Sequence, residues 1–175
     1  MLFSEVIGQE ALKKQLVHLV EQKRLSHALL FAGPEGAGAL PLAIAFAQYI
    51  VSLPANNEGA VADLFGAATT EVKADTFYTP DQIENLPAYH RASKLMHPDL
   101  HFSFPSIIEK SGEKNLSANY IEEWREFIMG YPYGNVFDWL QFIKAENKQG
   151  NISAAECAEV KKNYLLKVLK VLIKF

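Results

Sequence analysis

The sequence has little cysteine and no excess of charge of either sign. Its 175 residues include one cysteine, Cys157, which excludes a disulfide within the chain and any zinc site built from several cysteines. The 17 Lys and Arg residues against 20 Asp and Glu residues give a formal net charge of −3. This balance excludes binding of nucleic acid through bulk positive charge alone, although it allows a local basic stripe.

Long hydrophobic runs are also missing. No run approaches the roughly 18 apolar residues of a membrane span, and residues 1–5 do not form a signal peptide. Because 49% of the residues are hydrophobic and 21% are charged, the chain can form an ordinary core, which excludes disordered and collagen-like classes. We expect a soluble cytoplasmic protein with no membrane partner, of one domain or at most two small ones.

The first 51 residues predict a helix, a buried strand and a second helix. On the first helix, apolar residues recur with helical spacing and Lys13 falls elsewhere. The apolar residues are Leu12, Leu16, Leu19 and Val20. The run 28–32 predicts a strand buried on both faces, as in parallel sheets. Nearly every residue of 40–51 is apolar, which predicts a helix buried almost all round and starting close to Gly38 or Ala39.

The middle of the chain has a weaker pattern. Residues 52–80 read as a long surface excursion, with a helical turn near 61–65. A helix is predicted over 81–96 with Pro87 in its interior, followed by a strand with alternating apolar residues at 100–104.

The last third predicts three helices and a final strand. One helix covers about 120–128, one is capped by Asn135, and one opens at Ser153 with a capping-box pattern. The inward face of the last helix is expected to hold Cys157, Val160 and Tyr164. A β-branched run at 168–175 predicts the strand, and no turn residue separates it from the helix, so residues are predicted to be missing near 167–170. The order of elements favours an α/β fold with a largely parallel sheet.

Four aromatic residues on two of these helices could stack on nucleobases. They are Trp124, Phe127, Trp139 and Phe142. Their helical spacing favours packing in the core instead, and the acidic residues around them disfavour nucleic acid. The only basic stripe, near the C-terminus, is more simply a solvated helix face.

A glycine-rich loop lies between the predicted buried strand and the helix that follows it. Residues 33–40 have the outline of a phosphate-binding loop, in which glycines let backbone N–H groups face phosphate. That motif places Lys and then Ser or Thr after the last glycine, whereas this chain has Ala39 and Leu40. Lys would contact the β- and γ-phosphates and Ser or Thr would bind Mg²⁺. Losing one charge-assisted hydrogen bond costs about 1.5–3 kcal/mol, so ATP and Mg²⁺ binding should be weak or lost and hydrolysis negligible.

The simpler alternative is a strand-to-helix turn that merely contains three glycines. The flanking segments favour descent from a nucleotide-binding loop.

Three segments together resemble a known family. They are residues 3–9 (FSEVIGQ), residues 25–38 (LSHALLFAGPEGAG) and the His-Pro-Asp segment within 95–101. The chain is similar in these segments to bacterial clamp-loader subunits, the AAA+ gamma/tau and delta-prime subunits of DNA polymerase III. This resemblance implies a P-loop NTPase-like (AAA+) parallel sheet flanked by helices. It covers the first 50 residues closely, then 95–105, and the last helix and strand more loosely.

Within that family, a glycine loop without its Lys implies the delta-prime type, which does not hydrolyse ATP. The resemblance thus implies a non-enzymatic scaffold in DNA replication, with gamma/tau and delta subunits as partners and the sliding clamp and primed DNA as indirect ones. It implies a vestigial nucleotide site at Val6, Ile7, Gly33, Pro34, Gly36, Gly38, Ala39 and Leu40. No catalytic residue and no metal ligand is expected.

The chain departs from the family pattern in two respects. No cysteine lies between Ser52 and Met96, where members commonly hold zinc with four cysteines, so the zinc module is expected to be absent or rebuilt without metal. The sequence also stops at Phe175, before the acidic Walker B strand, so 1–175 is expected to be the N-terminal AAA+ domain of a longer subunit, with an insert at about 52–96. Two alternatives remain: a gamma/tau-like ATPase with a substitute cation, and a P-loop-derived interaction domain outside replication.

Overall fold

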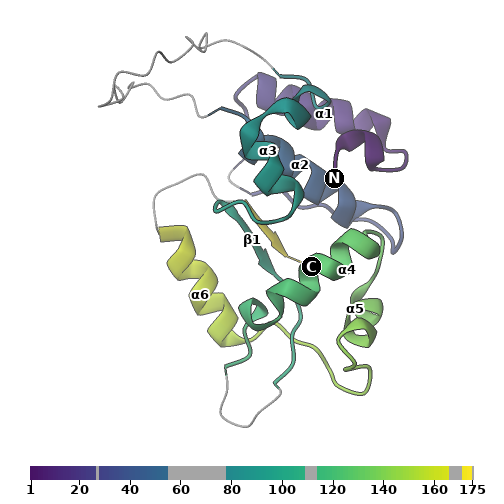
Figure 1. The fold of residues 1–175 in the computed structure, drawn as a ribbon, viewed down its shortest axis with the longest axis vertical. Helices are drawn as coiled ribbons and strands as arrows, with labels where there is room; N and C mark the ends of the chain where they lie inside the picture. Colours follow the sequence, from purple (N-terminus) through teal and green to yellow (C-terminus); the bar gives the residue numbers. More distant parts are fainter. Residues whose placement is uncertain (27, 55–77, 109–113, 166–170, 175) are drawn as a thin grey trace.

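A computed structural model describes residues 1–26, 28–54, 78–108, 114–165 and 171–174 of the chain. These residues are mostly helical. Figure 1 shows α1, α2 and α3 gathered at one end and α4, α5 and α6 at the other, with two strands between them. The elements are η1 (Phe3–Glu5), α1 (Glu10–Glu21), α2 (Ala39–Ser52), η2 (Gln82–Asn85), α3 (Pro87–Ser93), β1 (Leu100–Ser103), η3 (Ser117–Tyr120), α4 (Ile121–Gly130), α5 (Val136–Phe142), α6 (Ala154–Leu165) and β2 (Val171–Lys174). None of the described helices is long and apolar enough to cross a bilayer.

The two strands pair in parallel, as the order of elements predicted. Leu100 lies opposite Val171 and Ser103 opposite Lys174, so the final strand runs beside the strand that precedes the last three α-helices. Within the described part of the chain the sheet consists of these two strands. The larger parallel sheet expected from the sequence is therefore not seen there.

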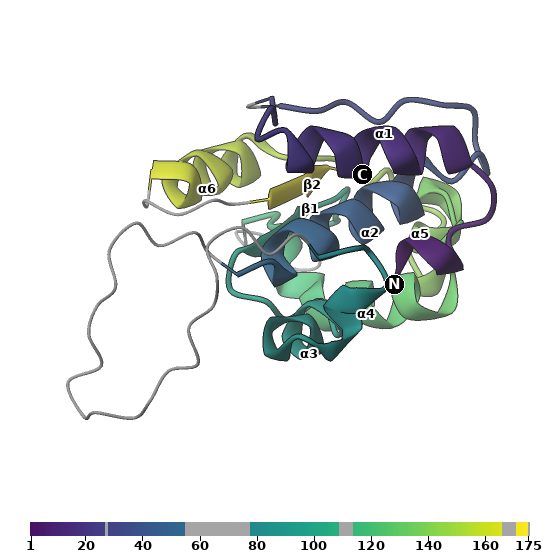
Figure 2. The same ribbon diagram turned by 90° about the horizontal axis from the view of Figure 1, so that it is seen from above.

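Helix α2 is the central helix. It begins at Ala39 after Gly38, whose φ of +84° is a left-handed conformation that suits glycine. Ten of its residues are buried, which confirms the prediction of a helix covered almost all round. Figure 2 shows α2 between α1 and α3, and it contacts both of these helices and both strands.

One core cluster is built on the aromatic residues of α4 and α5. Trp124, Phe127 and Trp139 are at most 1% exposed, and the Trp124 ring stacks on Phe104 with centroids 4.2 Å apart. Trp124 and Trp139 meet edge to face at 5.1 Å. Core packing is therefore confirmed for three of the four aromatic residues, while Phe142 stays 36% exposed.

A second core cluster joins η1 and α1 to the other side of α2. Phe3, Phe46 and Tyr49 lie within it, and the Phe3 ring meets the Tyr49 ring edge to face at 5.9 Å. Ile44 of α2 belongs to the first cluster, whereas Phe46 belongs to the second. One helix therefore connects the two halves of the core.

The predicted buried strand at 28–32 is wrong. These residues form no strand, and Leu30 is 90% exposed. An apolar run becomes a strand only when neighbouring strands pair with it, and no described strand lies beside this one. Phe31 alone packs inward, with its ring 6.2 Å from that of Phe46.

The predicted helix over 81–96 is divided in two. A 3-10 turn ends at Asn85, Leu86 is extended, and α3 starts at Pro87. Proline lacks the N–H that an interior helical position donates, but the first position of a helix does not need it. Pro87 therefore starts a helix here instead of lying inside one.

Two predicted helix faces are rotated. In α1, Leu12 is 46% exposed and Lys13 is buried, because the Lys13 ammonium donates to the carbonyl of Val6 at 2.6 Å. In α6, Cys157 is exposed and Glu156 is buried, because the Glu156 carboxylate accepts the backbone N–H of Ser117 at 2.9 Å. The predicted inward position of Cys157 is therefore wrong. Leu12 belongs to the apolar pattern of α1 but lies outside its buried face, whereas Leu16 of the same pattern is buried.

Three further predictions lie outside the described residues. These are the helical turn near 61–65, the gap near 167–170 and the side chain of Tyr164.

Candidate functional site

The glycine loop forms a tight turn that leads directly into α2. Gly36 and Gly38 have φ values of +75° and +84°, and the backbone N–H of Ala37 donates to the carbonyl of Pro34 at 3.1 Å. Residues with a side chain rarely adopt such positive φ values, because the Cβ atom clashes with the backbone. Glycine has no Cβ and therefore allows this backbone path. The turn thus has a physical reason for its glycines whether or not it binds a ligand.

The two positions that follow the loop offer only hydrocarbon. Ala39 is the first residue of α2, and the partly buried side chain of Leu40 packs against the first core cluster. Neither side chain can donate to a phosphate or bind a cation.

The segment that precedes α1 lies against the loop. The side-chain amide of Gln9 donates to the carbonyl of Ala37 at 3.2 Å. Val6 is buried in the second core cluster, while the side chain of Ile7 is 77% exposed. The two parts of the predicted site, residues 6–7 and residues 33–40, are thus brought together in space.

The residue that touches both parts is Tyr133, in the turn between α4 and α5. Its hydroxyl accepts the backbone N–H of Ile7 at 2.7 Å. Its ring carbon Cε1 lies 3.2 Å from the point where a Cβ on Gly38 would stand. No sequence pattern points to Tyr133, because it lies 126 residues from Ile7 and no local pattern links the two.

Lys13 is the cation that holds the start of this segment. Its ammonium lies 2.6 Å from the carbonyl of Val6 and 2.7 Å from the carboxylate of Glu10, and its side chain is 9% exposed. Both contacts fix residues 6–10 to the first turns of α1. Lys13 therefore has a structural role at the edge of the predicted site.

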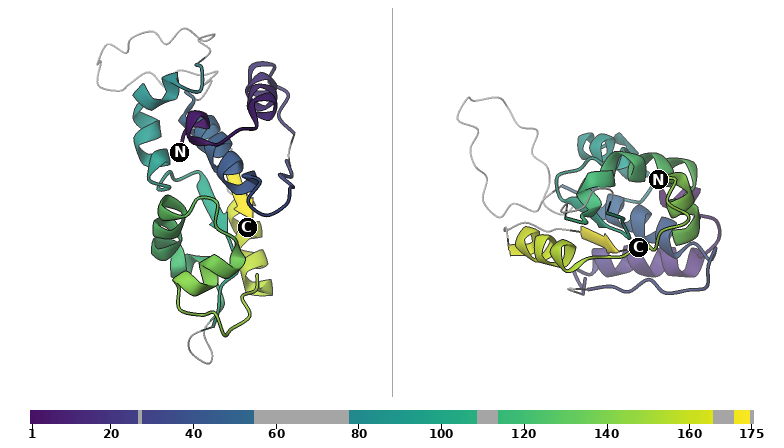
Figure 3. Two further views of the ribbon diagram at one scale, coloured as in Figure 1. Left: turned by 90° about the vertical axis from the view of Figure 1, so that its right-hand side faces the viewer. Right: turned by 90° about the horizontal axis from the view of Figure 1, so that it is seen from below.

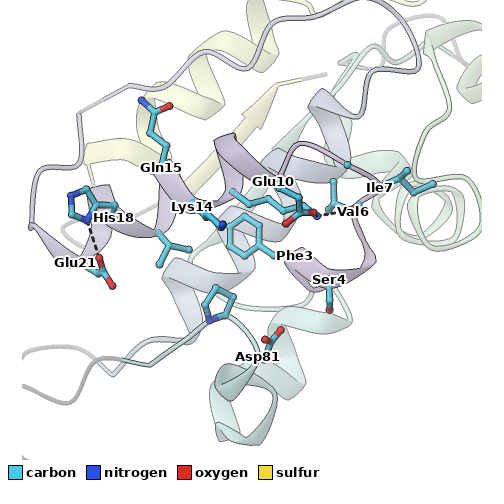
Figure 4. A pocket seen from close by; sticks show the side chains of 14 residues that line it. Phe3, Ser4, Val6, Ile7, Glu10, Lys14, Gln15, His18, Glu21 and Asp81 are labelled. Carbon is cyan, nitrogen blue, oxygen red and sulfur yellow. Dashed lines mark hydrogen bonds and ion pairs between the residues drawn. The ribbon is translucent and has the colours of Figure 1, made fainter.

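A groove of about 1020 Å³ runs between η1, α1 and the Pro80–Asp81 turn (Figure 4). Of the predicted site residues, only Val6 and Ile7 line it, so the groove is separate from the glycine loop. Its charged side chains have both signs, and the His18 ring lies 3.0 Å from the Glu21 carboxylate. The groove therefore has no single charge preference.

Titratable groups in the second core cluster are shifted by burial. Burial raises the pKa of Tyr49 and the pKa of Tyr89 to about 12, and negative charge from Glu21 and Glu5, respectively, contributes less. The Tyr49 hydroxyl donates to the carbonyl of Tyr78 at 2.9 Å. Both phenols stay neutral at physiological pH. Among the described residues, no three His, Cys, Asp or Glu side chains are grouped to hold a metal ion.

Comparisons with known proteins show which family this chain belongs to. Over 48 residues the chain is 44% identical to DNA polymerase III subunit tau of Bacillus subtilis (strain 168), a stretch that covers 27% of this chain and 8% of that protein. No solved structure matches the chain. Residues 8–169 match the family described as "DNA polymerase III, delta subunit". Because this match includes most of the sequence, the chain belongs to the DNA polymerase III delta subunit family.

Proposed function

We propose that this chain is a non-catalytic subunit of the bacterial clamp loader, of the delta-prime type. The observation that carries the proposal is the start of α2, where Ala39 and Leu40 follow the last glycine of the loop and Leu40 packs into the core. A loop without a cation and without a hydroxyl ligand for Mg²⁺ cannot support ATP hydrolysis by the usual route.

The role of such a subunit would be in assembly. We propose that it binds gamma/tau and delta subunits in the cytoplasm, and that it acts on the sliding clamp and primed DNA only through them. Residues 1–175 would form the N-terminal part of a longer subunit, with an insert at about 52–96.

The vestigial site would be formed by backbone groups. These belong to Val6, Ile7, Gly33, Pro34, Gly36, Gly38, Ala39 and Leu40. The loop turn and the contact between Gln9 and Ala37 support this grouping.

A gamma/tau-like ATPase is the second candidate, because the 48-residue stretch is 44% identical to a tau subunit. That function would need a substitute cation. Within the described structure the Lys13 ammonium contacts the predicted site at the Val6 carbonyl, and its hydrogen bonds to Val6 and Glu10 hold it at the start of α1.

Two measurements on the full chain distinguish the candidates. Affinity purification of the tagged chain from its own cells, followed by mass spectrometry, should recover the other clamp-loader subunits. Titration with a fluorescent ATP analogue should show no Mg²⁺-dependent binding in the micromolar range. Micromolar binding that requires Mg²⁺ would favour the ATPase, and recovery of no clamp-loader subunit would favour an interaction domain outside replication.

A further inference from the structure

We propose that Tyr133 is a built-in occupant of the vestigial nucleotide site and excludes a planar heterocycle, such as a purine base, from the space between Ile7 and Gly38. The inference rests on the proposed function and deepens it. Its basis is that one side chain contacts both parts of the site: its hydroxyl accepts the Ile7 N–H at 2.7 Å, and its ring lies against Gly38.

The chemistry of the contact resembles that of a bound ligand. A planar aromatic ring lies against a glycine, and an oxygen acceptor satisfies an exposed backbone N–H. A heterocycle with an acceptor atom would need the same N–H and the same space. Tyr133 and such a ligand therefore compete for the site.

The backbone around Tyr133 holds the ring in this position. The N–H of Gly134 donates to the carbonyl of Tyr131 at 3.0 Å, and a Cβ on Gly134 would stand 2.6 Å from the buried ring of Phe127. Directly afterwards, Asn135 begins α5 with a side-chain cap. The left view of Figure 3 shows α4 and α5 side by side at the end of the molecule away from α1. Tyr133 is thus presented by packed elements and not by a free loop.

The glycine loop offers a matched pair of variants that tests the ring contact. Gly36→Ala and Gly38→Ala both place a side chain at positive φ, but only Gly38→Ala also meets Tyr133, since Gly36 faces open space. Gly38→Ala should therefore raise the unfolding equilibrium constant more than Gly36→Ala does, and this difference should disappear in a Tyr133→Ala background. Equal effects of the two glycine variants in the wild-type background would overturn the contact.

The hydrogen bond is tested separately by amide exchange. In Tyr133→Phe, exchange of the Ile7 N–H should be roughly two to ten times faster, the range expected for one neutral hydrogen bond. Tyr131→Phe, on the more exposed neighbouring tyrosine, should leave it unchanged. Unchanged Ile7 exchange in Tyr133→Phe would overturn the proposed occupancy.

Competition is measured with a fluorescent ADP analogue without Mg²⁺. If the ring fills the site nine-tenths of the time or more, its removal in Tyr133→Ala should tighten binding at least about tenfold, because apparent affinity scales with the open fraction. Tyr131→Ala should leave the affinity for the ADP analogue unchanged. No gain in Tyr133→Ala, with circular dichroism showing a folded variant, would overturn the exclusion.

The outcomes for the two proposals are separable. If clamp-loader subunits are recovered but Tyr133 variants change neither stability, Ile7 amide exchange nor ADP-analogue binding, the proposed function would stand and only the Tyr133 proposal would be contradicted. Loss of partner recovery would contradict the proposed function, while the exchange and glycine experiments would still report on Tyr133.

Discussion

At the scale of single residues, His97 couples the fold to pH. Its side chain is 12% exposed, and its Nδ1 accepts the backbone N–H of Asp99 at 3.2 Å. Burial lowers the pKa of His97 below its usual value of 6.5, and positive charge from Arg91 adds to this, although the Asp99 carboxylate partly opposes it. The folded state thus favours the neutral ring, which alone can accept at Nδ1.

We predict that His97 makes the protein less stable in mild acid. Between pH 6.5 and the lower pKa of the folded state, the unfolded chain binds more protons, so the free energy of unfolding falls as pH falls through this window. His97→Asn keeps a side-chain acceptor for the turn and should flatten this pH dependence, measured by urea unfolding at pH 7.5 and 5.5. His90→Asn, at an exposed position, is the control and should retain the wild-type slope.

Gly134 allows the turn that carries Tyr133. A methyl group there would stand 2.6 Å from Cζ of Phe127 and 3.1 Å from the carbonyl oxygen of Tyr131. Gly134→Ala should therefore lower the free energy of unfolding by about 1–3 kcal/mol through overpacking, measured by urea denaturation. Gly130→Ala, which meets nothing within 4 Å, is the matched control. Equal stability of the two variants would contradict the packing described for Phe127.

At the scale of elements, α5 shows how a short helix is fixed at its start. Asp138 donates its backbone N–H to Asn135 Oδ1 at 3.0 Å, and the Asp138 carboxylate accepts the Asn135 N–H at 2.9 Å. Seven residues form few internal hydrogen bonds, so capping and the burial of Trp139 stabilise this helix.

We expect Asn135→Ala to cost about 1 kcal/mol of folding stability, as for other lost N-caps. Chemical denaturation followed by circular dichroism measures this cost. Asn147→Ala, at an exposed asparagine outside the helices, should cost much less. A cap effect no larger than that of the control would mean that packing alone fixes α5.

At the scale of the whole molecule, α2 joins two aromatic clusters into one core. Both tryptophans, Trp124 and Trp139, lie in the first cluster, whereas Phe46 lies in the second. Tryptophan fluorescence therefore reports directly on only one half of the core.

We predict that the two halves unfold together. Phe46→Ala should lower the stability by about 3–5 kcal/mol, as for other large buried aromatics. Because α2 is shared, the midpoint of the tryptophan fluorescence transition should fall as far as that of circular dichroism. An unchanged fluorescence midpoint in Phe46→Ala would show that the second cluster unfolds on its own.

Local signals determined much of this protein. Helical periodicity predicted α1 and α4, a nearly continuous apolar run predicted α2, and alternation predicted β1. The Asn135 cap predicted the start of α5, and the capping-box pattern at Ser153 predicted the start of α6. Each of these signals depends on residues close in sequence. The glycine loop and the unusual residues after it, Ala39 and Leu40, could likewise be read directly. The family resemblance followed from the same local segments, and the match over 8–169 confirms it at the level of the family.

Tertiary structure decided what depends on distant partners. The run 28–32 has a strand-like composition, but no described neighbour pairs with it, and Pro87 begins a helix because the chain is extended at Leu86. Specific hydrogen bonds turn Lys13 and Glu156 inward. Tyr133 meets Ile7 only because α4 and α5 fold back onto the glycine loop. Sequence spacing carries no information about such contacts, since their energy depends on atoms that only the folded chain brings together.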